Sequence, residues 1–352
     1  MKALEKIREI SKMLAACGIE TAEKEAELLV RQRLNADLVD LYKNNPELDD
    51  KQALDIDVMA GRRSKREPLQ YILGHSYFLG LKLLVGNGVL IPRPETELMA
   101  EYAVKAVSSQ RSAVSAKTPP IPPLVRGGEG GVRILDLCTG SGCLALALAK
   151  EFPEAHVYGT DISDTALRYA KKNARINGIE NVSFINGYLF EPFTIKENEN
   201  PPAFRCNASQ QREPSPFSKG GLNSPLSRGV RGVSPSLAKR GEGRFFNQNK
   251  FDLIISNPPY IMTDEIQTLQ PEIKDWEPRG ALDGGPDGLK FYREIISEAG
   301  KFLKTNGILM LEIGAGCAHE VIHMMKDAGY TEIEVRKDYA GIERIIQAKW
   351  TN

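Results

Sequence analysis

The sequence of 352 residues is 41% hydrophobic, enough for one large domain or two modest domains with filled cores. Its 46 lysine and arginine residues balance 46 aspartate and glutamate residues, and this neutrality argues against a protein that works on bulk duplex DNA. No run approaches the roughly 18 apolar residues that span a membrane, and no secretory leader opens the chain. Scattered cysteines without paired spacing favour a cytoplasmic protein, and the histidines form no ligand cluster, so no metal site is expected.

Residues 1–70 are expected to form a small helical N-terminal domain. Apolar residues recur there at helical spacing in two stripes, which are Leu4, Ile7, Ile10 and Leu14, and then Ala26, Leu29, Val30 and Leu34. Gly18 separates the two expected helices. Because the segment carries no chemistry of its own, it is either a substrate-recognition domain or a cap.

Residues 71–94 are predicted to form a hairpin and a linker, with apolar runs at 77–83 and 89–91. Pro92 and Pro94 then stiffen the entry into the next helix. The charged residues at 93–97 suit either the cap of this helix or a functional site beside it.

From residue 95 to residue 352, strand-like and helix-like segments alternate, which predicts an α/β domain with a doubly wound, mainly parallel sheet. The expected strands are 134–137, 156–160, 182–186, 251–256, 308–313, 333–336 and 344–348, and the expected helices are 143–152, 164–177, 288–303 and 318–328. Only residues 338–341 join the last two strands. A link this short cannot carry a parallel crossover, so the final pair should be antiparallel.

Two stretches, 108–131 and 194–249, interrupt this alternation. They are rich in Pro, Gly and Ser and share a degenerate repeat that contains Lys or Arg and Gly. This composition predicts disordered insertions that the domain does not need for activity. The repeated basic residues could instead form a nucleic-acid-binding tail, but no interleaved aromatic residues support that alternative.

The tetrapeptide of Asn257, Pro258, Pro259 and Tyr260 directly follows the apolar run 251–256. Two consecutive prolines stop a strand without starting a helix, so they predict a stiff loop at the carboxyl end of a strand. Open α/β sheets bind their ligands at such strand ends. The loop offers a carboxamide, backbone carbonyls and an aromatic ring, which suit a planar NH2 group.

A second loop follows the expected strand that contains Asp136, and its residues are Cys138, Thr139, Gly140, Ser141 and Gly142. Small residues between a strand and a helix let a ligand approach the backbone closely. Asp161 ends the next expected strand, where a carboxylate can accept hydrogen bonds from ribose hydroxyls. Together these features indicate methyl transfer from S-adenosylmethionine to a planar nitrogen.

The segments 91–97, 136–142, 257–260 and 277–285 occur in this order as Ile-Pro-Arg-Pro-Glu-Thr-Glu, Asp-Leu-Cys-Thr-Gly-Ser-Gly, Asn-Pro-Pro-Tyr and Glu-Pro-Arg-Gly-Ala-Leu-Asp-Gly-Gly. The set resembles the glutamine methyltransferases that modify peptide chain release factors, the PrmC/HemK family. The resemblance covers nearly the whole chain apart from the two insertions. It implies a seven-stranded Rossmann-like methyltransferase fold, S-adenosylmethionine as the cofactor, release factors as protein substrates, and no stable binding of nucleic acid.

The resemblance assigns catalysis to Asn257, Pro258 and Tyr260, and substrate binding to these three together with Pro259. Cofactor contacts fall to the following residues: Asp136, Cys138, Thr139, Gly140, Ser141, Gly142, Asp161, Leu189 and Asn257. In the mechanism, the Asn257 side-chain oxygen and the Pro258 carbonyl accept the two amide hydrogens of a glutamine and aim its nitrogen at the methyl group. Tyr260 packs against the amide plane or closes the pocket.

Two positions depart from the family pattern. Cys138 stands where a glycine is common, and it fits if its φ is negative. Tyr188 stands where the family commonly has an acidic residue for the adenine amino group, so Tyr188 would stack on adenine and Leu189 would form an apolar wall. The alternatives are a glutamine methyltransferase of a ribosomal protein, a nucleic-acid methyltransferase acting on adenine N6 or guanine N2, and a non-catalytic dinucleotide-binding module.

Overall fold

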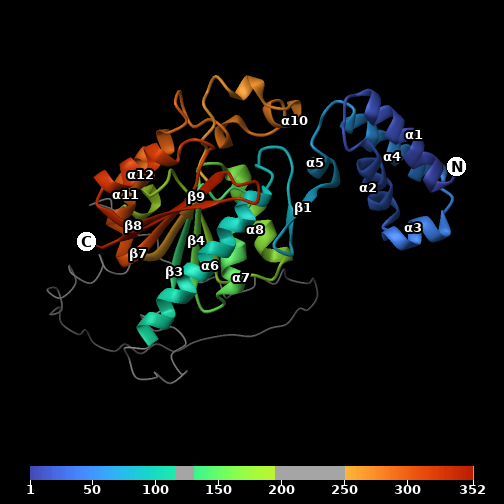
Figure 1. The fold of residues 1–352 in the computed structure, drawn as a ribbon. Helices are drawn as coiled ribbons and strands as arrows, with labels where there is room; N and C mark the ends of the chain where they lie inside the picture. The colour runs from blue at the N-terminus through green and yellow to red at the C-terminus, as the bar shows by residue number, and fades with distance from the viewer. Residues whose placement is uncertain (116–130, 195–249, 352) are drawn as a thin grey trace, which may run out of the picture. The chain divides into compact units, whose positions relative to one another are not determined.

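The computed structural model describes residues 1–115, 131–194 and 250–351 (Figure 1). The first part of the chain is helical and contains α1 (Ala3–Ala16), α2 (Ala22–Leu34), α3 (Leu38–Asn44), α4 (Asp50–Arg63) and α5 (Leu69–Leu73). A hairpin of β1 (His75–Phe78) and β2 (Leu81–Leu84) follows. The remaining elements are α6 (Pro94–Ser115), β3 (Arg133–Leu137), α7 (Cys143–Glu151), β4 (His156–Asp161), α8 (Asp164–Ile176), β5 (Val182–Asn186), β6 (Phe251–Ser256), α10 (Pro271–Lys274), α11 (Lys290–Phe302), β7 (Leu303–Glu312), α12 (Ala318–Asp327), β8 (Tyr330–Lys337) and β9 (Glu343–Trp350). Short 3-10 helices lie at Glu191–Phe193, Ile266–Thr268 and Arg279–Ala281.

The helical N-terminal region packs around a hydrophobic cluster of its own. Ile10 and Leu14 of α1 meet Leu29 and Val30 of α2 in this cluster, and all four side chains are buried. The two apolar stripes expected from the sequence therefore face each other. Gly18 lies between the helices with a φ of 74°, in the left-handed region where glycine carries no penalty.

The hairpin differs from the sequence expectation. The run 77–83 was expected to form one strand and 89–91 to form the next. The structure instead places the turn inside the first run, because Leu79 and Gly80 have φ values of 45° and 72° and reverse the chain there. Phe78 pairs with Leu81 across this two-residue turn, and residues 89–91 form no strand. The strand assignment for 89–91 was therefore wrong.

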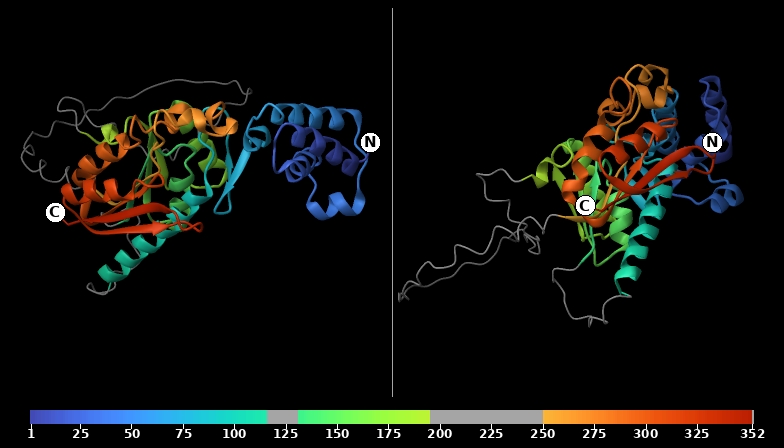
Figure 2. Two further views of the ribbon diagram at one scale, coloured as in Figure 1. Left: turned by 45° about the horizontal axis from the view of Figure 1, so that its top comes forward. Right: turned by 60° about the vertical axis from the view of Figure 1, so that its left-hand side comes forward.

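The large sheet has the strand order β5-β4-β3-β6-β7-β9-β8. Strands β5, β4, β3, β6 and β7 are parallel neighbours, whereas β9 is antiparallel to both β7 and β8. This confirms the doubly wound, mainly parallel sheet and the antiparallel final pair. The connections β3-α7-β4 and β6-α11-β7 run in opposite directions along the sheet. Since such crossovers are right-handed, α7 and α11 cover opposite faces (Figures 1 and 2).

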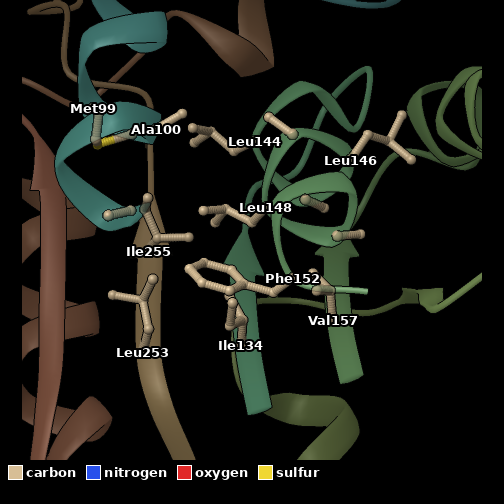
Figure 3. Close-up of a cluster of buried hydrophobic side chains, with 14 of the residues drawn as sticks. Met99, Ala100, Ile134, Leu144, Leu146, Leu148, Phe152, Val157, Leu253 and Ile255 are labelled. Carbon is tan, nitrogen blue, oxygen red and sulfur yellow. The ribbon is translucent and has the colours of Figure 1, made fainter. Parts of the chain in front are cut away.

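One face of the sheet packs against α6 and α7. Figure 3 shows Ile134 of β3 and Leu253 and Ile255 of β6 facing Leu148 and Phe152 from α7 and the residue after it. The alternation along β6 follows the strand period of two, so Ile254 points to the other face, where it is equally buried. Burial on both faces explains the unbroken apolar run in this strand.

Most residues of the two expected insertions lie outside the described residues. Helix α6 continues to Ser115, so residues 108–115 at the start of the first stretch are helical. By contacts between residues, the described residues of Met1–Pro192 and Lys250–Asn352 form one compact unit. Across the described residues, every helix is too short or too polar to cross a membrane.

Candidate active site

The two loops that the sequence singled out lie side by side. Strands β3 and β6 are parallel neighbours, and Leu137 pairs with Ser256 at their carboxyl ends. The Ser256 hydroxyl is buried and donates a hydrogen bond of 2.8 Å to the Leu137 carbonyl. The loop that begins at Cys138 and the loop that begins at Asn257 therefore start next to each other, although 119 residues separate Leu137 from Ser256.

The carboxylate of Asp136 is hydrogen-bonded to the glycine-rich loop and to the helix that follows it. Its Oδ2 accepts hydrogen bonds from the Thr139 hydroxyl at 2.6 Å and from the Ala145 backbone N–H at 3.2 Å. Its Oδ1 is buried and has no hydrogen-bond partner among the described residues. Burial raises the pKa of Asp136 to about 7. A buried acceptor without a donor is costly unless a ligand or water satisfies it.

The backbone of this loop is left-handed at three positions. Gly140 and Gly142 have φ values of 57° and 82°, and a Cβ on Gly142 would come within 3.1 Å of the Ala170 Cβ. Cys138 also has a positive φ, of 56°. The negative φ expected for Cys138, as a residue with a Cβ, is therefore wrong. The loop holds Cys138 in a conformation that costs about 1–2 kcal/mol for residues other than glycine.

Asp161 ends β4 beside this loop. Its Oδ2 accepts the Gly140 backbone N–H at 2.9 Å, and its Oδ1 accepts the Ser163 backbone N–H at 2.8 Å. The side chain is half-buried, and burial raises its pKa. Each carboxylate oxygen has a second lone pair, so Asp161 can accept two further hydrogen bonds from a ligand while it holds the loop.

An acidic group lies beside Tyr188 even though the sequence lacks one at this position. The Tyr188 hydroxyl donates a hydrogen bond of 2.6 Å to the carboxylate of Glu294 on α11. Leu189 is buried with a φ of 46°, and its carbonyl accepts a hydrogen bond of 3.2 Å from Thr160. Both residues therefore lie at the carboxyl edge of the sheet, next to β4.

The loop after β6 is fixed by side chains from two distant elements. Asn257 is half-buried, and its Nδ2 donates to the Thr96 hydroxyl on α6 at 3.1 Å. The Thr96 hydroxyl donates in turn to Oε2 of Glu312, at the end of β7, at 2.7 Å. The Tyr260 hydroxyl lies 3.4 Å from the other oxygen of Glu312. Pro258 and Pro259, which separate these two anchored residues, are buried.

The segment 277–285 forms the outer support of this loop. Gly284 lies against Tyr260, because a Cβ on Gly284 would be only 2.7 Å from the Tyr260 Cα. Ile261 donates its N–H to the Leu282 carbonyl at 2.9 Å and accepts from the Gly284 N–H at 2.8 Å. Glu277 accepts from the Arg93 guanidinium at 2.6 Å and from the Ile91 N–H at 3.3 Å.

The same connection contacts the helical N-terminal region through α10. Glu272 accepts hydrogen bonds of 2.9 Å from both Arg63 and Arg66. Arg63 is buried, and it also forms a bidentate pair with Glu25 at 2.5 and 3.2 Å. Burial opposes the charged form of Glu272, but a hydrogen bond from its own backbone N–H and the contacts with the two arginines together lower its pKa below the ordinary value.

The structure therefore brings the predicted residues of both loops to one edge of the sheet, and it adds residues that sequence reasoning missed. Thr96 lies in the segment 93–97, for which a helix cap and a functional site were both considered, and Glu277 lies in a quoted segment for which no role was given. Glu312 and Glu294 were not considered. One signal could have found Glu312, since it is an acidic residue near the end of the apolar run 308–313 and is almost fully buried.

Comparison with known proteins places two matching family models on this chain. The model described as PrmC N-terminal domain matches residues 5–74, and the model described as Methyltransferase domain matches residues 129–200. The release factor glutamine methyltransferase of Thermodesulfovibrio yellowstonii is 39% identical over 98% of this chain and 97% of its own length. The protein of the same name from Geobacter sulfurreducens is 34% identical over 95% of this chain and 91% of its own length.

Proposed function

Because this chain belongs to the release factor glutamine methyltransferase family, we propose that it methylates the side-chain nitrogen N5 of the Gly-Gly-Gln glutamine in peptide chain release factors. S-adenosylmethionine is the methyl donor, and when bound it supplies an electrophilic methyl group on a sulfonium centre. The observation that carries the proposal is the fixed carboxamide of Asn257, which lies beside two buried prolines at the end of β6.

The cofactor site fits a ligand that carries an amino group and ribose hydroxyls. Asp136 has a buried oxygen without a partner, and Asp161 keeps a free lone pair on each oxygen. A Cβ on Gly140 would find no atom nearer than 4.0 Å, so the loop is open at this point. We assign the ribose to Asp161, the loop contacts to residues 138–142 and the apolar wall to Leu189.

The substrate pocket has acceptors for an amide NH2 group. The nitrogen of an amide is a poor nucleophile, because its lone pair is delocalised into the carbonyl. The side-chain oxygen of Asn257 and the Pro258 carbonyl would accept the two N–H hydrogens, which leaves the lone pair to develop on the opposite side. Tyr260, held by Glu312, would pack against the amide plane. No strong general base is needed, since the methylated amide sheds a proton readily.

We further propose that residues 1–70 recognise the protein substrate, that 71–94 link them to the catalytic domain, and that 95–352 carry catalysis in the cytoplasm. Exposed apolar side chains on α3 and α4 support the first assignment. Val39 and Tyr42 are 68% and 52% exposed, and Leu54 and Val58 are 63% and 56% exposed. Such side chains on helical surfaces suit a protein partner.

The test is label transfer from S-adenosylmethionine to purified release factors, to a release factor with the Gly-Gly-Gln glutamine replaced by asparagine, to ribosomal proteins and to DNA or RNA. We expect label on the first substrate alone, and a loss of about 10²-fold or more in turnover for Asn257→Ala with little change in cofactor affinity. Label on nucleic acid or ribosomal proteins, with none on release factors, would contradict the assignment.

A further inference from the structure

Three side chains from three elements form a continuous chain of hydrogen bonds behind the candidate pocket. Asn257 follows β6, Thr96 lies in the first turns of α6, and Glu312 ends β7. The Thr96 hydroxyl stands in the middle, 3.1 Å from the Asn257 Nδ2 and 2.7 Å from the Glu312 carboxylate. Thr96 and Glu312 are 2% and 1% exposed, so water does not compete for these hydrogen bonds.

The direction of this chain follows from the inventory of hydrogens. An ionised carboxylate only accepts hydrogen bonds, and a hydroxyl has one hydrogen to give. The Thr96 hydroxyl therefore donates its hydrogen to the Glu312 carboxylate, and it can only accept a hydrogen bond from Asn257. The group of Asn257 that faces Thr96 is then its NH2. The carboxamide oxygen is on the other side, where an N–H donor can reach it.

We propose that Glu312 and Thr96 are positioning residues that set the orientation of the Asn257 carboxamide, so that its oxygen and not its NH2 group meets the substrate amide. The proposal rests on the function proposed for Asn257. Glu312 also holds the Tyr260 hydroxyl through its second oxygen, at 3.4 Å. One carboxylate thus orients both the first and the last residue of the Asn-Pro-Pro-Tyr loop.

The proposal implies that turnover depends on the charge of Glu312. A protonated Glu312 can donate to Thr96, which then can donate to Asn257 and hold the carboxamide with its NH2 group toward the substrate. Burial raises the pKa of Glu312 to about 7. The titratable and charged groups that face it are Glu95 on α6, Tyr260 after β6, Tyr292 on α11, Arg344 on β9 and Cys143 on α7. Turnover should therefore rise as the pH increases through about 7.

The decisive variant is Glu312→Gln, which keeps the shape and removes the charge. A glutamine NH2 group can donate to Thr96 and so permits the reversed chain of hydrogen bonds. We expect kcat to fall at least tenfold and its rise near pH 7 to disappear, while S-adenosylmethionine affinity stays within about twofold. The pH profile is needed because Asp136 also has a pKa near 7. If that carboxyl caused the rise, Glu312→Gln would leave the rise in place and overturn the proposal.

Substitutions of Thr96 give an independent test, in which a serine that restores the hydroxyl should also restore turnover. Thr96→Ser keeps the hydroxyl and should retain most of the turnover. Thr96→Val keeps the shape without the hydroxyl, and its turnover should fall as much as that of Glu312→Gln. The double variant of Thr96→Val with Glu312→Gln should lose no more turnover than either single variant, because each change interrupts the same chain of hydrogen bonds. Glu298→Gln is the matched control on α11, where the side chain is 43% exposed and pairs with Lys301, and it should match the wild type. If Glu312→Gln does not fold, the Thr96 pair decides alone.

Failure of this inference can be told apart from failure of the proposed function. Wild-type kcat in Thr96→Val, or equal losses in Thr96→Ser and Thr96→Val, would overturn the positioning role. If Asn257→Ala loses turnover in the same assay, the function assigned to the pocket survives that result. If Asn257→Ala also keeps wild-type turnover, the pocket assignment itself fails.

Discussion

The guanidinium group of Arg93 lies 2.6 Å from the carboxylate of Glu277, 184 residues away in sequence. The side chain of Glu277 is 1% exposed and that of Arg93 is 30% exposed. The pair joins the entry of α6 to the segment that supports Tyr260. The segments 91–97 and 277–285, which the resemblance gave only as separate motifs, are therefore in direct contact.

Arg93→Ala should lower the free energy of unfolding by about 3 kcal/mol, because it leaves a buried carboxylate without its cation. Urea denaturation at neutral pH measures this change. Arg293→Ala is the control, since Arg293 pairs with Asp287 where both side chains are about half exposed. That variant should change the free energy of unfolding by less than about 1 kcal/mol. An equal loss in both variants would show that burial of Glu277 does not matter.

Gly284→Ala should reduce turnover more than tenfold and lower the melting temperature. The new Cβ would be 2.7 Å from the Tyr260 Cα and 2.9 Å from the Gly288 carbonyl oxygen, and both are backbone atoms that cannot rotate away. Gly280→Ala is a matched control in the same segment, because its Cβ would meet no atom within 4 Å. Kinetics and thermal unfolding of the two variants check the prediction, which fails if they behave alike.

The left-handed backbone of Cys138 makes opposite predictions for two substitutions. Cys138→Gly relieves the strain of a Cβ at a φ of 56° and should leave stability unchanged or raise it by up to about 1 kcal/mol. Cys138→Val adds a branched side chain at the same φ and should lower stability by more than about 2 kcal/mol. Denaturant unfolding of both variants gives the comparison. A valine variant as stable as the glycine variant would show that the loop relaxes to a negative φ.

The mainly parallel, doubly wound sheet and the antiparallel direction of its final pair could be predicted from the sequence, because buried parallel strands leave apolar runs and a four-residue link permits only an antiparallel pair. The hairpin turn could not, since Leu79 adopts a left-handed φ that its residue type does not signal. Cys138 likewise adopts a left-handed φ that its residue type does not signal. In both cases the surrounding structure imposes a backbone conformation against the local preference of the residue.

Asp161→Ala should weaken S-adenosylmethionine binding by roughly 1.5–3 kcal/mol, measured by calorimetry. The structure gives two reasons, which are the loss of the acceptors proposed for the ribose and the release of the Gly140 N–H. Asp164→Ala, at an exposed position on the following helix, is the control and should bind the cofactor like the wild type. Unchanged affinity in Asp161→Ala would remove Asp161 from the cofactor site.

Glu312→Gln should change the pH dependence of stability in a way that can be measured apart from its effect on turnover. Burial raises the pKa of Glu312 from its ordinary value of about 4.5 to about 7, so the folded protein keeps a proton that the unfolded chain releases. The stabilisation by that proton is complete below about pH 4.5 and is lost as the pH rises through about 7, by up to about 3 kcal/mol. The stability of the variant relative to wild type should therefore increase between pH 5 and pH 8 in denaturant titrations. A constant difference would mean that Glu312 does not titrate in this range.

The loop residues of the candidate site were accessible to sequence reasoning because each follows a recognisable strand. Thr96 and Glu312 were not, because their contact spans 216 residues and depends on how α6 crosses the ends of β6 and β7. A residue type such as threonine near a helix start has a sufficient local explanation as a cap. Only the folded arrangement shows that its hydroxyl is directed to a carboxamide and a carboxylate.

The contact of Glu272 with Arg63 and Arg66 has a thermodynamic consequence. Glu272 belongs to the connection that also contains Tyr260 and Gly284, so the helical region and the Asn-Pro-Pro-Tyr loop share one set of supports. We expect that a macromolecule which tightens this contact and thereby orders the Asn-Pro-Pro-Tyr loop would raise the affinity of the proposed pocket for a glutamine side chain. By linkage, an occupied pocket raises the affinity of the helical region for that macromolecule by the same factor.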